Sequence, residues 1–221
     1  MGYHSGQIFE AELLVVIPQR SYGTRKKGWS ESKLNRRLGN TEQRIASLNS
    51  TISTFGALER SEQVYSLNNI GDSGGAGYTT YNTDSGIIEI NYTGDTGNFV
   101  HEVTHAGQFE SGHLAFYSDG SPAGSDLYDE AAAYRAQYAY SDGGFQGIGV
   151  SGFSDLTTYW VKGVRNPKTG VPVYTKYGLL PININTSIGL MGIAYPHHNI
   201  PYYSYSPELK LRDWPGLIYK K

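Results

Sequence analysis

The order of apolar and polar residues predicts one long helix followed by three short strands. Between residues 41 and 58 the apolar side chains recur every three or four positions, as on an amphipathic helix. Residues 63–68, 77–81 and 86–92 are instead rich in β-branched and aromatic side chains, with turn residues around them. We expect three strands of a small sheet, with the first two paired to each other and the helix covering the sheet.

Two further helices are expected in the middle of the chain. Residues 98–109 follow a turn-rich stretch after the third strand, and residues 126–137 form an alanine-rich run without glycine. Residues that favour helix caps stand at the start of each: Thr96 and Asn98 for the first, Ser125 and Asp126 for the second. The sequence therefore predicts a strand, a turn, a helix, a loop and a second helix in this order.

The two ends of the chain show weaker periodicity. Residues 13–17 predict a short buried strand, and a basic loop continues from there to residue 40. Residues 1–40 together suit a junction segment of a larger protein. Beyond residue 141 turns alternate with short apolar segments, and helical spacing returns at residues 186–194. We interpret residues 1–221 as a single α+β domain with a small twisted sheet, two central helices and a loop-rich part at residues 141–221.

Composition narrows the choice of function. The chain has 28 glycines and 19 tyrosines in 221 residues, which favours many short elements and loops over a helical bundle. A net charge of -2 and a pI near 6.3 disfavour nucleic acid as a partner, and we interpret the basic cluster at residues 20–37 as a solvated face. The lack of cysteine excludes disulfides, thiol chemistry and metal sites built on sulfur.

The cellular location is left open by the sequence. No stretch approaches the roughly 20 apolar residues that span a bilayer, and the first residues lack the apolar core of a signal peptide. We therefore expect no membrane span. Export would depend on a larger parent protein or on a dedicated secretion system.

The first central helix carries His101, Glu102 and His105 in the pattern H-E-x-x-H. On a helix the two histidines stand one turn apart and about 40° around the axis, so both imidazoles can bind one metal ion. Glu102 lies about 100° from His101, too far round to be a ligand but close enough to reach a water on the metal. This arrangement is typical of hydrolytic zinc sites; the alternative is a pair of surface histidines on an amphipathic helix.

A catalytic zinc site needs a third protein ligand from elsewhere in the chain. The metzincin pattern is excluded, because Gln108 and Ser111 stand where that pattern requires glycine and histidine. Our candidate is Glu130, in or just after the first turn of the second central helix, and Asp129 is the rival. Both acids also suit the positive end of the helix dipole without binding a metal.

These residues resemble a known family. His101-Glu102-x-x-His105, with a glutamate on a second helix, resembles the gluzincin type of zincin metallopeptidase. The sequences of residues 99–108 and 129–137 also resemble, more loosely, those of metallopeptidase toxin domains at the C-termini of Rhs and other polymorphic bacterial toxins. Asp129 and Tyr134 stand where many gluzincins have asparagine and aspartate.

The resemblance implies a zinc-dependent peptidase with a zincin-like fold, in which Glu102 is the general base. It implies three zinc ligands: His101, His105 and Glu130. The expected partners are a protein or peptide substrate and, for a secreted effector or toxin, an immunity or inhibitor protein. In zincins the strand beside the site is a sheet edge that binds extended substrate, which places residues 86–92 at an edge. The alternative is a zincin-like binding or structural module without catalysis.

Two smaller features complete the candidates. Residues 71–75 match the sequence that surrounds the nucleophilic serine of chymotrypsin-like proteases. Those proteases need a catalytic histidine and aspartate well before the serine, and His4 is the single histidine before Ser73. A glycine-rich hairpin loop is therefore the better interpretation. A peptidase also needs a donor that stabilises the oxyanion. The candidates are tyrosines and histidines outside the motif: Tyr134, Tyr138, Tyr140, His113, His197 and His198. The first choice is the pair His197 and His198, two donors in an aromatic loop that could fold over the site.

Overall fold

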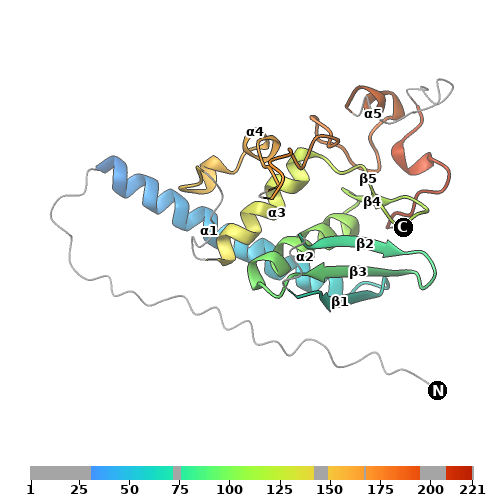
Figure 1. Cartoon of the computed structure of the whole chain (residues 1–221), viewed down its shortest axis with the longest axis horizontal. Helices are drawn as coiled ribbons and strands as arrows, with labels where there is room; N and C mark the ends of the chain where they lie inside the picture. The colour runs from blue at the N-terminus through green and yellow to red at the C-terminus, as the bar shows by residue number, and fades with distance from the viewer. Residues whose placement is uncertain (1–30, 72–75, 142–148, 167, 195–207, 221) are drawn as a thin grey trace, which may run out of the picture. The chain divides into compact units, whose positions relative to one another are not determined.

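The computed structural model describes residues 31–71, 76–141, 149–166, 168–194 and 208–220 (Figure 1). The chain divides into two units, Met1–Arg36 and Arg37–Lys221, and the following description concerns the second. Helices and a small mixed sheet make it an α+β fold, as the sequence predicts. The strand expected at residues 13–17 and the serine at position 73 lie outside the described residues.

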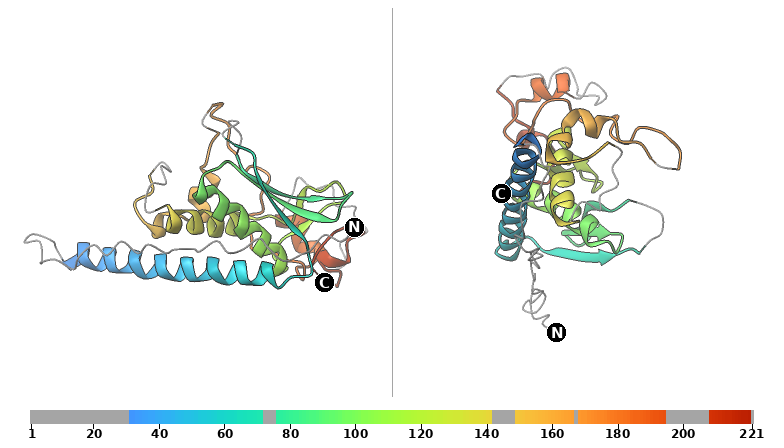
Figure 2. Two further views of the ribbon diagram at one scale, coloured as in Figure 1. Left: turned by 90° about the horizontal axis from the view of Figure 1, so that it is seen from below. Right: turned by 90° about the vertical axis from the view of Figure 1, so that its left-hand side faces the viewer.

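Helix α1, Glu31–Glu59, confirms the helix expected at residues 41–58 and begins earlier. Its buried side is formed near its end, where Phe55 and Leu58 pack against the core beneath the sheet. Ile45 and Ile52, which the apolar spacing places on the same face as Phe55, are about half exposed. Figure 2 (left) shows the part of α1 that belongs to the second unit running along α2 (Thr96–Glu110) and α3 (Leu127–Tyr140).

The three expected strands are present as β1 (Tyr65–Asn69), β2 (Tyr78–Asn82) and β3 (Ile87–Tyr92). The expected pairing of the first two strands is wrong: the order is β1-β3-β2, with β1 parallel and β2 antiparallel to β3 (Figure 1). A tight turn joins β2 to β3, and the fully buried Ile88 and Ile90 favour β3 at the centre.

The position of β3 corrects a second expectation. Residues 86–92 do not form a sheet edge, because both sides of β3 are paired. The two edge strands are β1 and β2, and Thr79 of β2 is hydrogen-bonded to Glu102 of α2.

Helices α2 and α3 confirm the two predicted central helices. The cap of α2 is Asp95, not Thr96 or Asn98, because the Asp95 carboxylate accepts hydrogen bonds from the Gly97 and Asn98 amides. Helix α2 packs on the sheet through Val103 and Ala106, which share a buried cluster with Ile90 of β3. This packing holds one face of α2 against the sheet.

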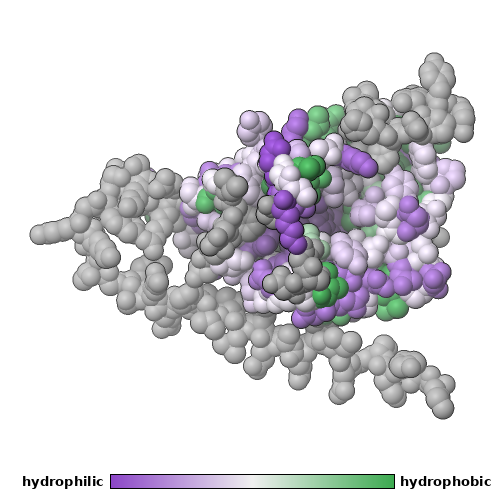
Figure 3. Space-filling view, in the orientation of Figure 1, coloured by the Kyte–Doolittle hydropathy of each residue, from purple (hydrophilic) through white to green (hydrophobic). Residues whose placement is uncertain are grey.

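The remaining described segments form short elements, in agreement with the loop-rich pattern of the sequence. They are β4 (Ala115–Phe116), β5 (Pro122–Ala123), the 3-10 helix η1 (Phe153–Asp155), α4 (Thr158–Lys162), α5 (Ile188–Ala194) and the 3-10 helix η3 (Leu211–Asp213). Phe116 pairs with Ile218, which ties the end of the described chain to the segment after α2. None of the described helices is both long and apolar enough to cross a membrane. The face seen in Figure 3 is mainly hydrophilic, with small separate hydrophobic patches.

Candidate metal centre

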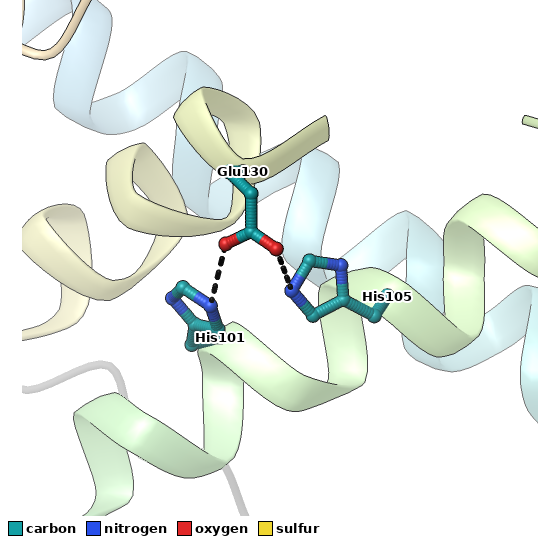
Figure 4. Close-up of side chains that lie close together, drawn as sticks. All are labelled: His101, His105 and Glu130. Atoms are coloured by element: carbon teal, nitrogen blue, oxygen red, sulfur yellow. Dashed lines mark ion pairs between the residues drawn. The ribbon is translucent and has the colours of Figure 1, made fainter. Parts of the chain in front are cut away.

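His101 and His105 project from the same side of α2 toward the start of α3 (Figure 4). Their ring centroids are 5.0 Å apart. His101 Nε2 lies 3.5 Å from Glu130 Oε2, and His105 Nε2 lies 3.6 Å from Glu130 Oε1. The structure therefore brings together the three side chains that the sequence proposes as ligands.

The cap of α3 determines which of the two neighbouring acids faces the histidines. Asp126 is the N-cap, and its carboxylate accepts from the amides of Tyr128 and Asp129. The Asp129 carboxylate accepts in return from the Asp126 amide at 3.3 Å, which completes a capping box. Asp129 is thus engaged in the cap, while Glu130, one position later, is turned toward α2.

The geometry of the cluster fits a metal ion. Glu130 Oε2 is buried and has no hydrogen-bond partner among the described residues, which is costly unless a cation compensates it. The donor atoms of His101, His105 and Glu130 all lie within 4.8 Å of one another. A tetrahedral site with bonds of about 2.1 Å has ligand separations of about 3.4 Å, close to the two His–Glu distances. This buried group could hold a metal ion.

The charge of Glu130 also suits a cation. Burial alone would raise the pKa of Glu130, but His105, His101 and the Tyr174 hydroxyl together outweigh it, and its pKa is lowered. The carboxylate therefore stays ionised in a nearly water-free position.

Glu102 is buried between α2 and the edge strand β2. Burial is the main cause that raises the pKa of Glu102 to about 7, and His105 opposes the rise. The carboxylate accepts from the Thr79 hydroxyl at 3.2 Å and from the Asn98 side chain. Neither Thr79 nor Asn98 was identified from the sequence as a residue of the site.

Gly77, next to β2, lies against the same carboxylate. A Cβ atom at this position would lie 2.9 Å from Glu102 Oε1 and 2.5 Å from Asn98 Oδ1. Real Cβ atoms do not approach so closely, so the space beside Glu102 requires glycine. The sequence offers one weak signal for this contact, a glycine at the start of an expected strand.

Three tyrosines lie around Glu130 and His101. The Tyr134 ring is 4.6 Å from the His101 ring, and its hydroxyl is 2.7 Å from that of Tyr174. Burial, with a contribution from Glu130, raises the pKa of Tyr134 to about 12 and raises the pKa of Tyr174 and Tyr177 further. All three are neutral hydrogen-bond donors at physiological pH. Tyr174 and Tyr177 were missed because they have no fixed spacing from the H-E-x-x-H pattern.

The other expected oxyanion donors are less well placed. Tyr138 packs edge-on against Phe153 with 5.0 Å between the ring centroids, and His113 is exposed. Tyr140 is half-buried in the last turn of α3. His197 and His198 lie outside the described residues. Tyr134 is the expected donor that contacts a histidine of the cluster.

The second ring nitrogens of both histidines contact glutamine side chains. His101 Nδ1 is 3.2 Å from Gln137 Oε1, and His105 Nδ1 is 2.8 Å from Gln108 Oε1. Each imidazole therefore has a polar partner on the side away from Glu130. Metal-binding histidines are usually oriented in this way.

No family model matches the chain, and comparisons with curated proteins and with solved structures find no match. In the part of the chain that the structure describes, His101, His105 and Glu130 form the one cluster of this kind that could hold a metal ion.

Proposed function

We propose that the protein is a zinc-dependent peptidase of the gluzincin type. The observation that carries this proposal is the convergence of His101, His105 and Glu130, with buried Glu102 on the same helix as the histidines. One oxygen of the Glu130 carboxylate has no hydrogen-bond partner among the described residues. The H-E-x-x-H pattern and the second helix with a glutamate support it.

The donor set favours zinc over other common cations. Two imidazole nitrogens and one carboxylate oxygen are a usual ligand set for catalytic zinc, whereas calcium and magnesium prefer sites made of oxygen atoms. When bound, zinc lowers the pKa of a water to about 7 and polarises the scissile carbonyl. The buried position of the cluster limits access of bulk water to the ligands.

Glu102 is the proposed general base. Its carboxylate is held from two sides, by Thr79 of β2 and by Asn98 one turn earlier on α2. It takes the proton of the attacking water and transfers it to the leaving amine. The Tyr134 ring lies beside His101, and its hydroxyl is paired with that of Tyr174; we assign to these two hydroxyls the stabilisation of the oxyanion.

The substrate is proposed to be an extended segment of a protein or peptide. The edge strand β2 begins beside Gly77, which contacts Glu102, so a chain added along this edge would pass the general base. Backbone hydrogen bonds to an edge strand are a common way of binding extended peptides. The resemblance to polymorphic-toxin domains supports an effector or toxin role, with an immunity or inhibitor protein as a second partner.

The test combines metal analysis with peptide digestion. Purified protein is expected to contain one zinc per chain and to cleave members of a broad peptide library. Glu102→Gln should keep the zinc and lose the cleavage, and Glu42→Gln, at an exposed position of α1, is the matched control. A folded protein that binds zinc but cleaves nothing would favour the non-catalytic zincin-like module. A folded protein that binds no metal would contradict both.

A further inference from the structure

We infer that Gln108 is a positioning residue that orients His105 and connects it to the helix that carries Glu130. The inference rests on the metal site of the proposed function and does not depend on peptide hydrolysis. Gln108 lies on α2, three residues after His105, and its side chain is buried. It belongs neither to the proposed ligands nor to the proposed catalytic groups.

The orientation of the Gln108 amide follows from its two partners. Its Nε2 lies 2.9 Å from the Asp129 carbonyl oxygen, which can only accept a hydrogen bond, so Nε2 is the end that faces α3. The Oε1 atom must then face His105, at 2.8 Å from Nδ1. Because Oε1 can only accept, Nδ1 of His105 carries the proton of this hydrogen bond. Nε2 of His105 is then the nitrogen that faces Glu130, 3.6 Å from Oε1.

The same contacts connect the two helices of the site. The Asp129 carbonyl belongs to the peptide bond that leads directly into Glu130. A continuous path therefore runs from His105 through Gln108 to the backbone of the third proposed ligand. All of its members are buried or half-buried, so Gln108 fixes the position of His105 relative to Glu130 before a metal binds.

His101 has a similar partner with a looser attachment. Gln137 Oε1 lies 3.2 Å from His101 Nδ1, but Gln137 is only half-buried. Among the described residues, no hydrogen bond holds the amide nitrogen of Gln137. Of the two glutamines, therefore, Gln108 is the one fixed at both ends.

This difference predicts different effects of the same substitution. A glutamate at position 137 still offers an acceptor to His101. A glutamate at position 108 would place a carboxylate oxygen against the Asp129 carbonyl, where no proton is available. We expect Gln137→Glu to keep zinc affinity within a few fold, whereas Gln108→Glu and Gln108→Leu weaken it about 10- to 100-fold.

Zinc affinity can be measured on the full chain by competition with a chromogenic chelator. Gln43→Leu, at an exposed position of α1, is the matched control and should leave the affinity unchanged. Thermal unfolding of the metal-free variants identifies any that fail to fold, and the two substitutions at position 108 make independent tests. An unchanged affinity in a folded Gln108 variant would overturn the inference.

A second measurement separates orientation from general stability. Nitrogen-15 NMR of the histidine rings in the metal-free protein should show a protonated, hydrogen-bonded Nδ1 in His105. In Gln108→Leu this hydrogen bond is lost, so the Nδ1 signal of His105 should shift while the signals of His101 stay as in the wild type. An unchanged His105 Nδ1 signal in Gln108→Leu would contradict the inference. If the wild type binds zinc without cleaving peptides, the peptidase proposal fails and the role of Gln108 stands.

Discussion

Asp129 and Glu130 are adjacent in the sequence, yet their carboxylates take different directions. Glu130 faces the two histidines at 3.5 and 3.6 Å, whereas Asp129 accepts a hydrogen bond from the Asp126 amide at the start of the same helix. The capping box thereby separates a structural acid from a proposed ligand. The two acids should respond differently to neutralisation.

Removing the charge of Glu130 should abolish the response of the protein to zinc. Glu130→Gln replaces a carboxylate that is buried without a hydrogen-bond partner for one of its oxygens in the described structure. Zinc at a hundred times its dissociation constant should stabilise the wild type by about 2.7 kcal/mol and leave this variant nearly unchanged. Thermal unfolding with and without zinc measures the effect, and an equal shift in both proteins would contradict the ligand role.

Asp129→Asn should change the pH dependence of stability rather than zinc binding. Burial, followed by the charge of Asp126, raises the pKa of Asp129 to about 8. A carboxyl group whose pKa is raised in the folded state contributes its full stabilisation at a pH below its pKa in the unfolded state, which is near 3.9. This contribution is lost as the pH rises toward 8. The stability of the metal-free variant relative to the wild type should therefore increase between pH 5 and pH 8, by at least about 1.4 kcal/mol. Urea unfolding at several pH values tests this, and a constant difference would refute it.

Gly77→Ala should impair catalysis while leaving the metal site intact. The new Cβ would press on Glu102 Oε1, on Asn98 Oδ1 and on the backbone carbonyl oxygen of Asn91 in β3, so the proposed base and the end of β2 must move. A displacement of about 1 Å can cost on the order of 100-fold in rate. Gly39→Ala is a suitable control, because a Cβ there has no neighbour within 4 Å. Zinc content and peptide cleavage should be measured together, and full activity in Gly77→Ala would exclude this contact as important.

Glu110 holds a separate network at the other end of α2. One of its oxygens accepts from the hydroxyls of Ser61 and Tyr65 and from Lys220 Nζ at 3.1 Å. Burial opposes ionisation, but these three partners outweigh it and lower the pKa of Glu110. Glu110→Gln should therefore cost about 1–2 kcal/mol at pH 7.

The cost of Glu110→Gln should depend on pH. A carboxyl group whose pKa is lowered in the folded state adds stability at a pH above its pKa in the unfolded state. This stability is lost as the pH falls through its pKa in the folded state. The difference between the wild type and the variant should thus shrink below about pH 4.3. Lys220→Met is expected to act in the same direction and to be non-additive with Glu110→Gln in urea unfolding. Additive effects would show that the two side chains are not coupled.

The parts of the site that local sequence determines could be predicted. The spacing of His101 and His105 defines one helix face, and the Asp126 cap with the alanine-rich run defines the start of α3. The distinction between Glu130 and Asp129 needed the structure, because both acids suit the first turn of a helix. The presence of the two helices was therefore predictable, but the directions of the Asp129 and Glu130 side chains were not.

The parts that depend on distant contacts were missed. The central position of β3 follows from its parallel pairing with β1, which no local pattern encodes. Four residues reach the site from segments that lie at no fixed distance in the sequence from the H-E-x-x-H pattern: Gly77, Thr79, Tyr174 and Tyr177. The exposed Ile45 and Ile52 show the same limit, since apolar spacing alone could not tell which stripe of α1 packs on the core.

The neighbouring positions of α2 and α3 in the chain make the proposed metal site local in sequence. About 30 residues separate His101 from Glu130, so the loop that must close to assemble the donors is short and its entropic cost is small. Both helices leave the ribosome well before residues 208–220, whose Ile218 pairs with Phe116. The three proposed ligands can therefore come together before the end of the chain has been synthesised.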